Sequence, residues 1–394
     1  MASSQPRWMR GTPLLAVLVL AFLVLASRAD AYVYWTNQGS TPSGASIGRA
    51  NTDGTGVNQH FISLPGSGPC LLAINDTNLF WSSQTSNEAI GRANIDGTGV
   101  NPNLFAADAP CGIAVNSSFI YYSNNATIGR ANLDGTTPDP SFIASPGGYP
   151  CGVTVDGSYV YWGHDSFIGR ANLDGTNSDP NWLPGPDGPC GMAVSGSYIY
   201  WANEGLTYPN NIGRANLDGN PGSVNNAFIT GGNLPCGVAV FNGKIYWGNF
   251  GNDLAPDTIG RANLDGTSVN QSFISGADAP CGPVVNAPNA FSAKVKGKKL
   301  IVTVQSPGTV KVTDAAGGAK SAAKKKRKLL LKNSSAKGNI PTITVKLKLT
   351  KLGNSKLSSK GKVKAKAKVT FTPDGGTAKT QTLKLKIKGK RKKH

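Results

Sequence analysis

The chain has 394 residues, 39 % of them hydrophobic and 15 % charged, with 49 Gly and 25 Pro. This composition permits a sizeable core but argues against helical bundles and coiled coils, because glycine and proline weaken the interior of a helix. The net charge of +19 hides two regions of opposite sign: residues 32–290 hold 7 Lys/Arg and 18 Asp/Glu, net −11, and residues 291–394 hold 30 and 2, net +28. We expect two domains with these boundaries, and charge excludes the first as a nucleic-acid binder.

Residues 1–31 have the layout of a signal peptide. Arg7 and Arg10 precede an apolar run at 14–25, and Ala29-Asp30-Ala31 forms a small-x-small cleavage site. The apolar run is shorter than the roughly 20 residues of a spanning helix, so an uncleaved anchor is the less favoured alternative. We expect a secreted or cell-surface protein with no transmembrane span after cleavage.

A five-residue motif, Ile-Gly-Arg-Ala-Asn, occurs six times after this segment. Each copy is followed, after one residue, by Asp-Gly, which predicts a tight hairpin turn of the primed types because these turns need positive φ. The copies begin at Ile47, Ile90, Ile128, Ile168, Ile212 and Ile259.

Three further segments recur in phase with this motif. A short apolar strand follows each turn, as at Phe61-Ile62; a Pro-Cys pair with small and branched residues comes next, as at 150–155; an aromatic pair completes the period, as at Tyr34-Trp35. Four short strands in a period of this length are typical of one blade of a β-propeller.

The two ends of the repeat region complement each other. The region begins with an aromatic-pair strand that no Pro-Cys strand precedes, and it ends with a Pro-Cys strand, 280–286, that no aromatic pair follows. Joining this last strand to residues 32–64 would make one blade and close the ring without an open edge. The expected fold class is all-β: a six-bladed β-propeller, circularly closed by its N-terminal strands, followed by a small β-sandwich.

The series Pro-x-Gly-[Val/Ile]-Ala-Val, Ile-Tyr-Trp-x-Asn and Ile-x-Arg-Ala-Asn-Leu-Asp-Gly, over residues 32–286, resembles the low-density lipoprotein receptor class B repeat, the YWTD repeat. The resemblance implies a six-bladed propeller in which the motif's Asp ties neighbouring blades through backbone hydrogen bonds. This chain departs there, reading Thr36-Asn37 in the first copy and Gly248-Asn249 in the last. Receptor-like ligand binding is therefore not carried over.

Alternation along a strand puts Gly48 and Ala50 on one face and Arg49 on the other. The small face would admit the aromatic pairs of an adjacent blade as core. Six equivalent arginines could ring an anion-binding surface. The favoured alternative is structural, each arginine bridging a carboxylate or backbone carbonyls near its own Asp-Gly turn. The arginines are Arg49, Arg92, Arg130, Arg170, Arg214 and Arg261.

Each of the six cysteines follows a proline at the start of the inner strand, so the predicted symmetry places them in a ring around the axis. In an oxidising compartment they would form three disulfides between neighbouring blades, with a connectivity that the sequence leaves open. Buried free thiols are an equal alternative, and a soft-metal site of thiolates ranks third because no metal-ligand spacing supports it. The cysteines are Cys70, Cys111, Cys151, Cys190, Cys236 and Cys281.

Catalytic motifs are missing from the sequence. No GxSxG, HExxH, Walker or EF-hand pattern occurs, and none of the three histidines recurs or sits in a motif. We expect no catalytic residue, metal or cofactor. The alternative is an extracellular propeller enzyme, of hydrolase or lyase type, whose site is built from the longer segments 36–46, 204–211 and 250–258. Its candidate acids are Glu204, Asp253 and Asp257.

From residue 291 onward lysines alternate with apolar residues, as at 345–349, 363–371 and 383–388. This period of two predicts antiparallel strands with one wet face, five to seven in all, in a β-sandwich. The pattern resembles immunoglobulin-like modules appended to bacterial secreted proteins. A run at Lys324, Lys325, Lys326, Arg327 and Lys328 is a candidate polyanion patch, expected in an exposed loop.

The expected function is that of a secreted, non-enzymatic binding or scaffold protein. The propeller would recognise an unidentified protein or glycan, and the basic module would bind anionic polymers of a cell envelope or matrix, with no specific nucleic acid. The alternative for the lysines is that they only keep a β-rich module soluble. A third possibility is self-association of the acidic and basic domains.

Overall fold

The computed structural model describes residues 31–39, 44–85, 88–144, 146–205, 207, 210–251, 256–286, 291–304, 308–315, 329–338, 342–373 and 378–389. The expected signal peptide up to residue 30, the basic run 324–328 and Asp253 lie outside these residues. No helix within them is long and apolar enough to cross a membrane.

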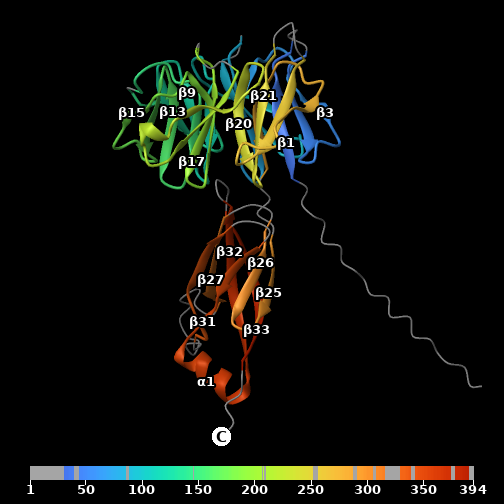
Figure 1. The fold of residues 1–394 in the computed structure, drawn as a ribbon, viewed down its shortest axis with the longest axis vertical. Helices are drawn as coiled ribbons and strands as arrows, with labels where there is room; N and C mark the ends of the chain where they lie inside the picture. The colour runs from blue at the N-terminus through green and yellow to red at the C-terminus, as the bar shows by residue number, and fades with distance from the viewer. Residues whose placement is uncertain are drawn as a thin grey trace, which may run out of the picture.

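Between residues 32 and 285 the described strands form six four-stranded antiparallel sheets (Figure 1). The first is β24 (Pro280–Val285), β1 (Tyr32–Asn37), β2 (Ser46–Asn51) and β3 (Asn58–Ser63). The second is β4 (Pro69–Ile74), β5 (Asn78–Ser83), β6 (Ala89–Asn94) and β7 (Asn101–Ala106). The third is β8 (Ile113–Val115), β9 (Phe119–Asn124), β10 (Thr127–Asn132) and β11 (Asp139–Ile143).

The other three sheets repeat the same order. The fourth is β12 (Val153–Val155), β13 (Tyr159–His164), β14 (Phe167–Asn172) and β15 (Asp179–Pro184). The fifth is β16 (Pro189–Ser195), β17 (Tyr198–Asn203), β18 (Ile212–Asn216) and β19 (Asn225–Ile229), with the 3-10 turn η1 (Pro221–Ser223). The sixth is β20 (Pro235–Phe241), β21 (Lys244–Asn249), β22 (Thr258–Asn263) and β23 (Asn270–Ser275).

The first sheet contains both ends of the repeat region. β24 pairs with β1, and the register sets Asn37 opposite Pro280 and Val33 opposite Val285. The backbone N–H of Asn286 also donates to the carbonyl of Tyr32 at 3.1 Å. The chain therefore enters and leaves this region at one end of the two strands, away from the proline.

Within each sheet the glycine of the repeated motif makes room for a large aromatic ring. Gly48 pairs with Trp35 across β1 and β2, and a Cβ on Gly48 would lie 2.3 Å from the indole. Gly129 stands in the same relation to Tyr122. The aromatic ring over the small face thus belongs to the same sheet, which corrects the expectation that an adjacent blade supplies it.

The Asp-Gly turns are not the two-residue primed turns that the sequence predicts. Asn51 pairs with Thr55 around a loop of three residues, in which only Gly54 adopts positive φ, at 91°. The Asp53 carboxylate accepts from the Thr55 N–H at 2.9 Å and from its hydroxyl at 2.7 Å. The threonine two residues after the aspartate favours this wider loop because it donates two hydrogen bonds to the carboxylate. The glycine supplies the left-handed backbone that the loop needs.

The core of the repeat region consists of six apolar clusters: five are each shared by two sheets, and one joins the second and third sheets and also includes all six cysteines. Tyr34 of β1 lies in one cluster with Trp81 of β5. Trp35 of β1 lies in another with Tyr246 of β21, so the first and sixth sheets share a core as well. The aromatic pairs are almost fully buried, which confirms their expected place in the core between sheets.

Residues 291–389 form a second all-β unit around one core of their own. A three-stranded sheet contains β25 (Ser292–Lys296), β26 (Lys299–Thr303) and β30 (Thr342–Lys346). A four-stranded sheet contains, in order, β29 (Ser334–Gly338), β27 (Gly308–Asp314), β32 (Lys362–Pro373) and β33 (Lys379–Lys388). A short pair joins β28 (Leu331–Lys332) and β31 (Lys348–Leu349).

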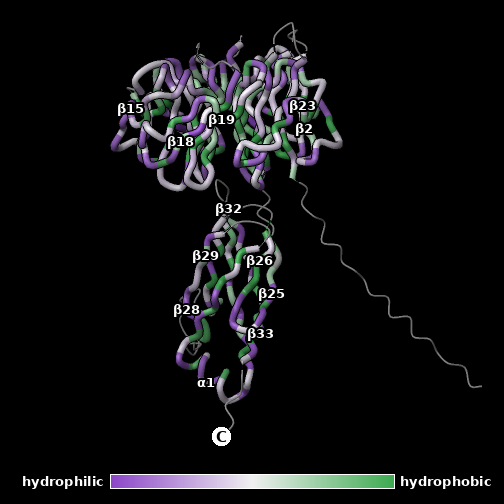
Figure 2. The backbone as a smooth tube through the Cα atoms, in the orientation of Figure 1, coloured by the Kyte–Doolittle hydropathy of each residue, from purple (hydrophilic) through white to green (hydrophobic). Residues whose placement is uncertain are grey.

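Figure 2 shows the alternation of hydrophilic and hydrophobic residues along these strands. One helix, α1 (Lys351–Lys360), is absent from the sequence prediction. Thr350 caps its start by accepting from the Gly353 N–H at 3.1 Å, and Gly361 ends it at φ 64°. Only Gly353 and Leu357 of this helix are buried, so it leaves little apolar pattern in the sequence.

Candidate ligand-binding site

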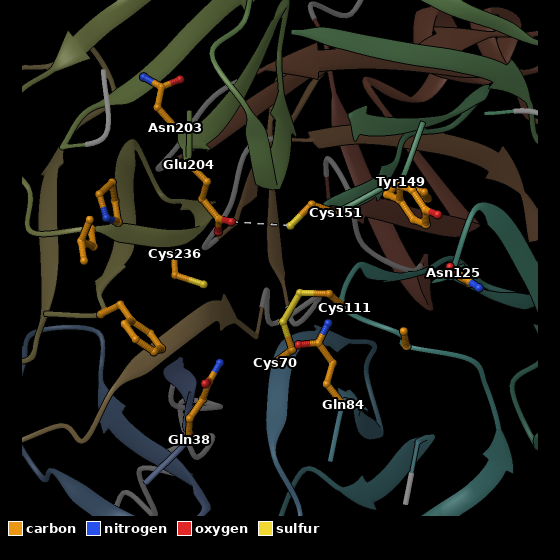
Figure 3. Close-up of a pocket in the computed structure, with 15 residues that line it drawn as sticks. Gln38, Cys70, Gln84, Cys111, Asn125, Tyr149, Cys151, Asn203, Glu204 and Cys236 are labelled. Carbon is orange, nitrogen blue, oxygen red and sulfur yellow. Dashed lines mark hydrogen bonds between the residues drawn. A yellow bond between two sulfur atoms is a disulfide. The ribbon is translucent and has the colours of Figure 1, made fainter. Parts of the chain in front are cut away.

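One end of the propeller axis opens into a cavity of about 530 Å³, which we call the mouth pocket (Figure 3). It lies at the end where the inner strands begin, opposite the end where the chain enters and leaves. Carboxamides, one carboxylate, two aromatic rings and the cysteines line it. These residues include Gln38, Gln84, Asn125, Asn203, Glu204, Tyr149, Phe250, Cys70, Cys111, Cys151 and Cys236.

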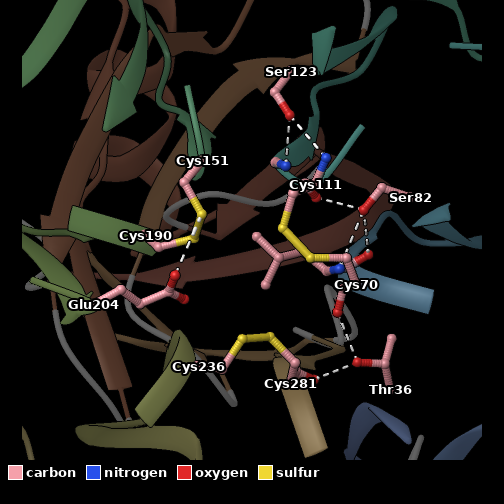
Figure 4. Close-up of a disulfide and its surroundings, with 12 residues drawn as sticks. Thr36, Cys70, Ser82, Cys111, Ser123, Cys151, Cys190, Glu204, Cys236 and Cys281 are labelled. Carbon is pink, nitrogen blue, oxygen red and sulfur yellow. Dashed lines mark hydrogen bonds between the residues drawn. A yellow bond between two sulfur atoms is a disulfide. The ribbon is translucent and has the colours of Figure 1, made fainter. Parts of the chain in front are cut away.

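Three disulfides surround the axis at the floor of the mouth pocket (Figure 4). They join Cys70 to Cys111, Cys151 to Cys190 and Cys236 to Cys281, with Cα–Cα distances of 5.4, 5.1 and 4.8 Å. Each bridge links the inner strands or their leading residues in two successive sheets. The disulfide interpretation is thus supported, and the free-thiol interpretation is wrong, since all six cysteines are paired.

Hydroxyl groups hold the backbone of this floor in place. Thr36 Oγ1 lies 2.8 Å from the carbonyl oxygen of Cys70 and 2.9 Å from that of Cys281, so it ties two different inner strands. Ser123 Oγ accepts from the N–H groups of Cys111 and Gly112 at 2.9 and 2.8 Å. In the first three sheets the residue after the aromatic pair therefore holds the floor, whereas in the other three it is Gly or Ala and has no hydroxyl.

The asparagine at the next position serves the strands and the connecting loop. Asn249 Oδ1 accepts from the Trp247 indole at 3.1 Å and from the Asn233 N–H at 3.1 Å, and its Nδ2 donates to the Gln271 carbonyl at 2.8 Å. Asn233 lies in the loop that leads from the fifth sheet into the sixth. An uncharged side chain thus binds backbone at the place where the YWTD motif has its Asp.

The residue that follows this asparagine position is Gln in the first and second sheets and differs among the other four. We call these six residues the mouth ring, and five of them line the mouth pocket, Asp165 being the exception. Variation at one end of the axis, above constant aromatic, glycine and arginine positions, is the pattern expected of a specificity surface. The mouth ring is Gln38, Gln84, Asn125, Asp165, Glu204 and Phe250.

The residue before each Pro-Cys pair varies in the same way. It is Tyr149 in the fourth copy, where the side chain is 75 % exposed beside the mouth pocket, and Ala109 and Leu234 in the third and sixth. The longer segments singled out from the sequence contain Gln38, Glu204 and Phe250, whereas the other residues at the two variable positions belong to no motif. Aligning the six copies and reading the positions that differ would have found them.

Glu204 is the sequence candidate that the structure places in the mouth pocket. Its carboxylate points across the pocket and lies 3.9 Å from Cys151 Sγ. The side chain keeps contact with solvent, but the enclosing protein raises the pKa of Glu204 to about 7 by desolvation. Within the described part of the chain no cation pairs with it.

The other sequence candidates lie elsewhere. Asp257 accepts from the Ala279 N–H at 2.7 Å, and desolvation raises its pKa. His164 takes the place of the asparagine in β13 and is buried, with Nε2 2.8 Å from the Pro180 carbonyl.

The repeated arginines lie away from the mouth pocket, between strands and against the next sheet. The Arg130 guanidinium lies over the rings of Phe119 and Phe142, at 4.5 and 4.0 Å, and donates to the Leu173 carbonyl at 3.4 Å. Arg261 donates to the Thr52 carbonyl at 3.1 Å, from the sixth sheet to the first. These carbonyls belong to the neighbouring sheet. The expectation that each arginine binds groups near its own Asp-Gly turn is therefore wrong for these two residues.

Comparison with known proteins identifies the fold of the repeat region. No protein-family model and no curated protein matches the chain. A chain in the crystal structure of a nidogen/laminin complex is similar with a TM-score of 0.53 and 19 % identity, over 65 % of this chain and 98 % of that one. TolB from Acinetobacter baumannii is similar with a TM-score of 0.51 and 11 % identity, over 65 % of this chain and 66 % of its own. These similarities and the sheet order confirm a β-propeller.

Proposed function

We propose that the six sheets are the blades of one closed ring of the YWTD class. Contacts between the sixth and first sheets support closure because they repeat those between other neighbours. Arg261 reaches Thr52 as Arg130 reaches Leu173. A Cβ on Gly54 would meet the Phe273 ring at 2.9 Å, just as one on Gly97 would meet Phe61 at 3.0 Å.

The protein acts outside the cytoplasm in this proposal. Three disulfides support that location, since disulfides persist in oxidising compartments. The expected signal peptide at residues 1–31 agrees with it.

The propeller recognises a ligand at the mouth pocket. The single observation that carries this proposal is a cavity of about 530 Å³ at one end of the axis, lined by five mouth-ring residues that lie outside the constant aromatic, glycine and arginine positions of the repeat. The volume is in the range of ligand pockets. Carboxamides both donate and accept hydrogen bonds, and the lining holds no cation, so the pocket suits an uncharged polar or cationic group of a glycan or protein.

Binding without catalysis is the better proposal for this pocket. Sugar-cleaving enzymes position two carboxyl groups on either side of the scissile bond. Among the described residues that line the pocket, Glu204 is the one carboxylate. The residues around it are amides, rings and disulfides, which supply surface and hydrogen bonds but no second acid or base.

The C-terminal module associates with anionic polymers in this proposal, through its net charge of +28. Two functions are thus divided between two units: selective recognition at the mouth pocket and electrostatic association through the module.

The test is binding of the labelled full chain to an array of purified envelope glycans and secreted proteins, at low and high salt. A mouth variant carries Gln84→Ala and Tyr149→Ala, and a matched control carries Thr98→Ala and Tyr159→Ala, outside the pocket. Some array positions should hold the full chain at high salt and lose the mouth variant at least tenfold. If every retained position binds the mouth variant as well as the control, the mouth pocket is not the recognition site.

A further inference from the structure

Two long strands of the C-terminal module carry paired lysines along one face. Their partners across β32 and β33 are again lysines at three consecutive outward positions, and all six side chains are exposed. We call these six residues the lysine ladder. It consists of Lys362–Lys388, Lys364–Lys386 and Lys366–Lys384.

The lysine ladder destabilises the sheet to which it belongs. Like charges placed directly opposite across two strands repel one another and destabilise the pair. A surface that serves only solubility mixes both signs of charge. The other end of the same strand pair has an uncharged pair instead, because the hydroxyls of Thr370 and Thr380 lie 2.7 Å apart. The stacked lysines are therefore not a requirement of the sheet.

The side chains of this face limit the kinds of anion that could neutralise its positive charge. Its remaining outward positions on β27, β32 and β33 are Lys or Thr in the described chain, with no acid and no aromatic ring. Every described cation of the module is a lysine, which binds phosphate as a point charge; arginine's fork matches carboxylate and phosphate alike, so the choice between these two anions rests on their spacing. Without rings, the face offers no platform for stacking nucleobases.

The spacing also fits an extended chain. Lysines on one face of a strand recur every second residue, a rise of about 6.7 Å. Successive phosphates of an extended phosphodiester polymer recur at a similar distance on one side. The carboxylates of a polyuronate alternate between sides, so their same-side repeat is longer.

We propose that the lysine ladder binds an extended phosphodiester polymer without bases, such as poly(glycerol phosphate), lying along β32 and β33. The inference rests on the proposed association of the module with anionic polymers and names the surface and the polymer. Bound phosphates would replace the repulsion between opposed lysines with attraction and release the polymer's counterions.

The test measures binding of the full chain to poly(glycerol phosphate) across a salt series. The ladder variant carries Lys→Thr at 364, 366, 384 and 386, which copies the native Thr370–Thr380 pair on the same strands. A matched control carries Lys→Thr at 294, 296, 299 and 346, four exposed lysines of the other sheet with the same change in charge. Lys296, Lys299 and Lys346 oppose one another there at a single level, so they form no run along the strands. Thermal unfolding of each variant shows whether the module stays folded.

The ladder variant should bind at least tenfold more weakly at about 0.1 M salt, with a log–log salt slope about three units shallower, while the control stays close to the unaltered chain. Its unfolding temperature should not fall, because opposed charges have been removed. An equal loss in both variants would show that only net charge matters and would overturn the ladder while leaving the association intact. Tighter binding to oligo(dT) than to poly(glycerol phosphate) would overturn the polymer assignment. No binding of the full chain to any polyanion would overturn the proposed association itself.

Discussion

Arg130 and Glu204 occupy positions that recur in every sheet, yet they serve different ends. The arginine is the same in all six copies; it packs on two rings of its own sheet and donates to a carbonyl of the next sheet. The glutamate stands where the copies differ and faces a cavity. The residue that is identical in all copies therefore serves the architecture, and the one that differs is free to contact a ligand.

The repeated arginines should contribute to stability in proportion to the rings they contact. Arg130 lies over two rings and Arg261 over Phe273 alone, whereas no ring contact is described for Arg92, which donates to the Leu133 carbonyl. We expect Arg130→Ala to lower the free energy of unfolding by about 2 kcal/mol, with a smaller loss for R261A and the smallest for R92A. Urea unfolding of the three variants measures the order. Equal losses would argue against ring stacking, and loss of anion binding at unchanged stability would favour the anion-binding ring.

The raised pKa of Glu204 makes stability depend on pH. Its pKa is about 7 in the folded chain against an ordinary value of 4.5, so the folded state holds the proton more tightly. The stabilisation is fully present below pH 4.5 and is lost as pH rises through 7. Glu204→Gln should therefore gain in unfolding temperature over the unaltered chain between pH 4.5 and pH 8. A difference between the two proteins that stays constant over this range would show that Glu204 titrates normally.

At the scale of the element, the fit of glycine beneath an indole determines whether a sheet can form. A Cβ on Gly169 would lie 2.3 Å from the Trp162 ring, while one on Gly157 would meet nothing within 4 Å. Gly169→Ala should cost about 3 kcal/mol, because the ring cannot move in a packed core. G157A should be neutral or slightly stabilising. Chemical denaturation of both variants compares them, and a loss below about 1 kcal/mol for G169A would mean that the sheets can separate to accept the methyl group.

The sheets could be predicted from the sequence because fixed offsets between aromatic, glycine and arginine positions recur in phase. The disulfide pairing could not, because each cysteine has equivalent neighbours on both sides; Cys111 Sγ lies within 4.8 Å of both sulfurs of the adjacent bridge. The mouth pocket could be predicted only in part: the segments 36–46, 204–211 and 250–258 supply Gln38, Glu204 and Phe250 to its lining. Gln84 and Tyr149 belong to no motif and gain meaning only when strand ends from different copies converge.

At the scale of the whole molecule, two kinds of link hold the two ends of the repeat region together within the first sheet and to the sixth sheet. Hydrogen bonds between β24 and β1 hold that sheet, and the Cys236–Cys281 disulfide fastens β24 to β20 of the sixth sheet. The three bridges span 41, 39 and 45 residues of sequence. Loop-closure entropy therefore predicts nearly equal contributions from all three.

In the proposed closed ring, one bridge has a second role that loop length does not capture. Cys236→Ala with Cys281→Ala should lower the free energy of unfolding by about 4 kcal/mol through chain entropy, as should C70A with C111A. The first pair should in addition loosen β24, so the amides of β1 should exchange faster with deuterium before global unfolding. Denaturant titration and hydrogen exchange on both double variants separate the two effects. Equal β1 protection in the two proteins would mean that strand pairing closes the ring without the bridge, whereas selective loss in the first would make that disulfide the clasp of the propeller.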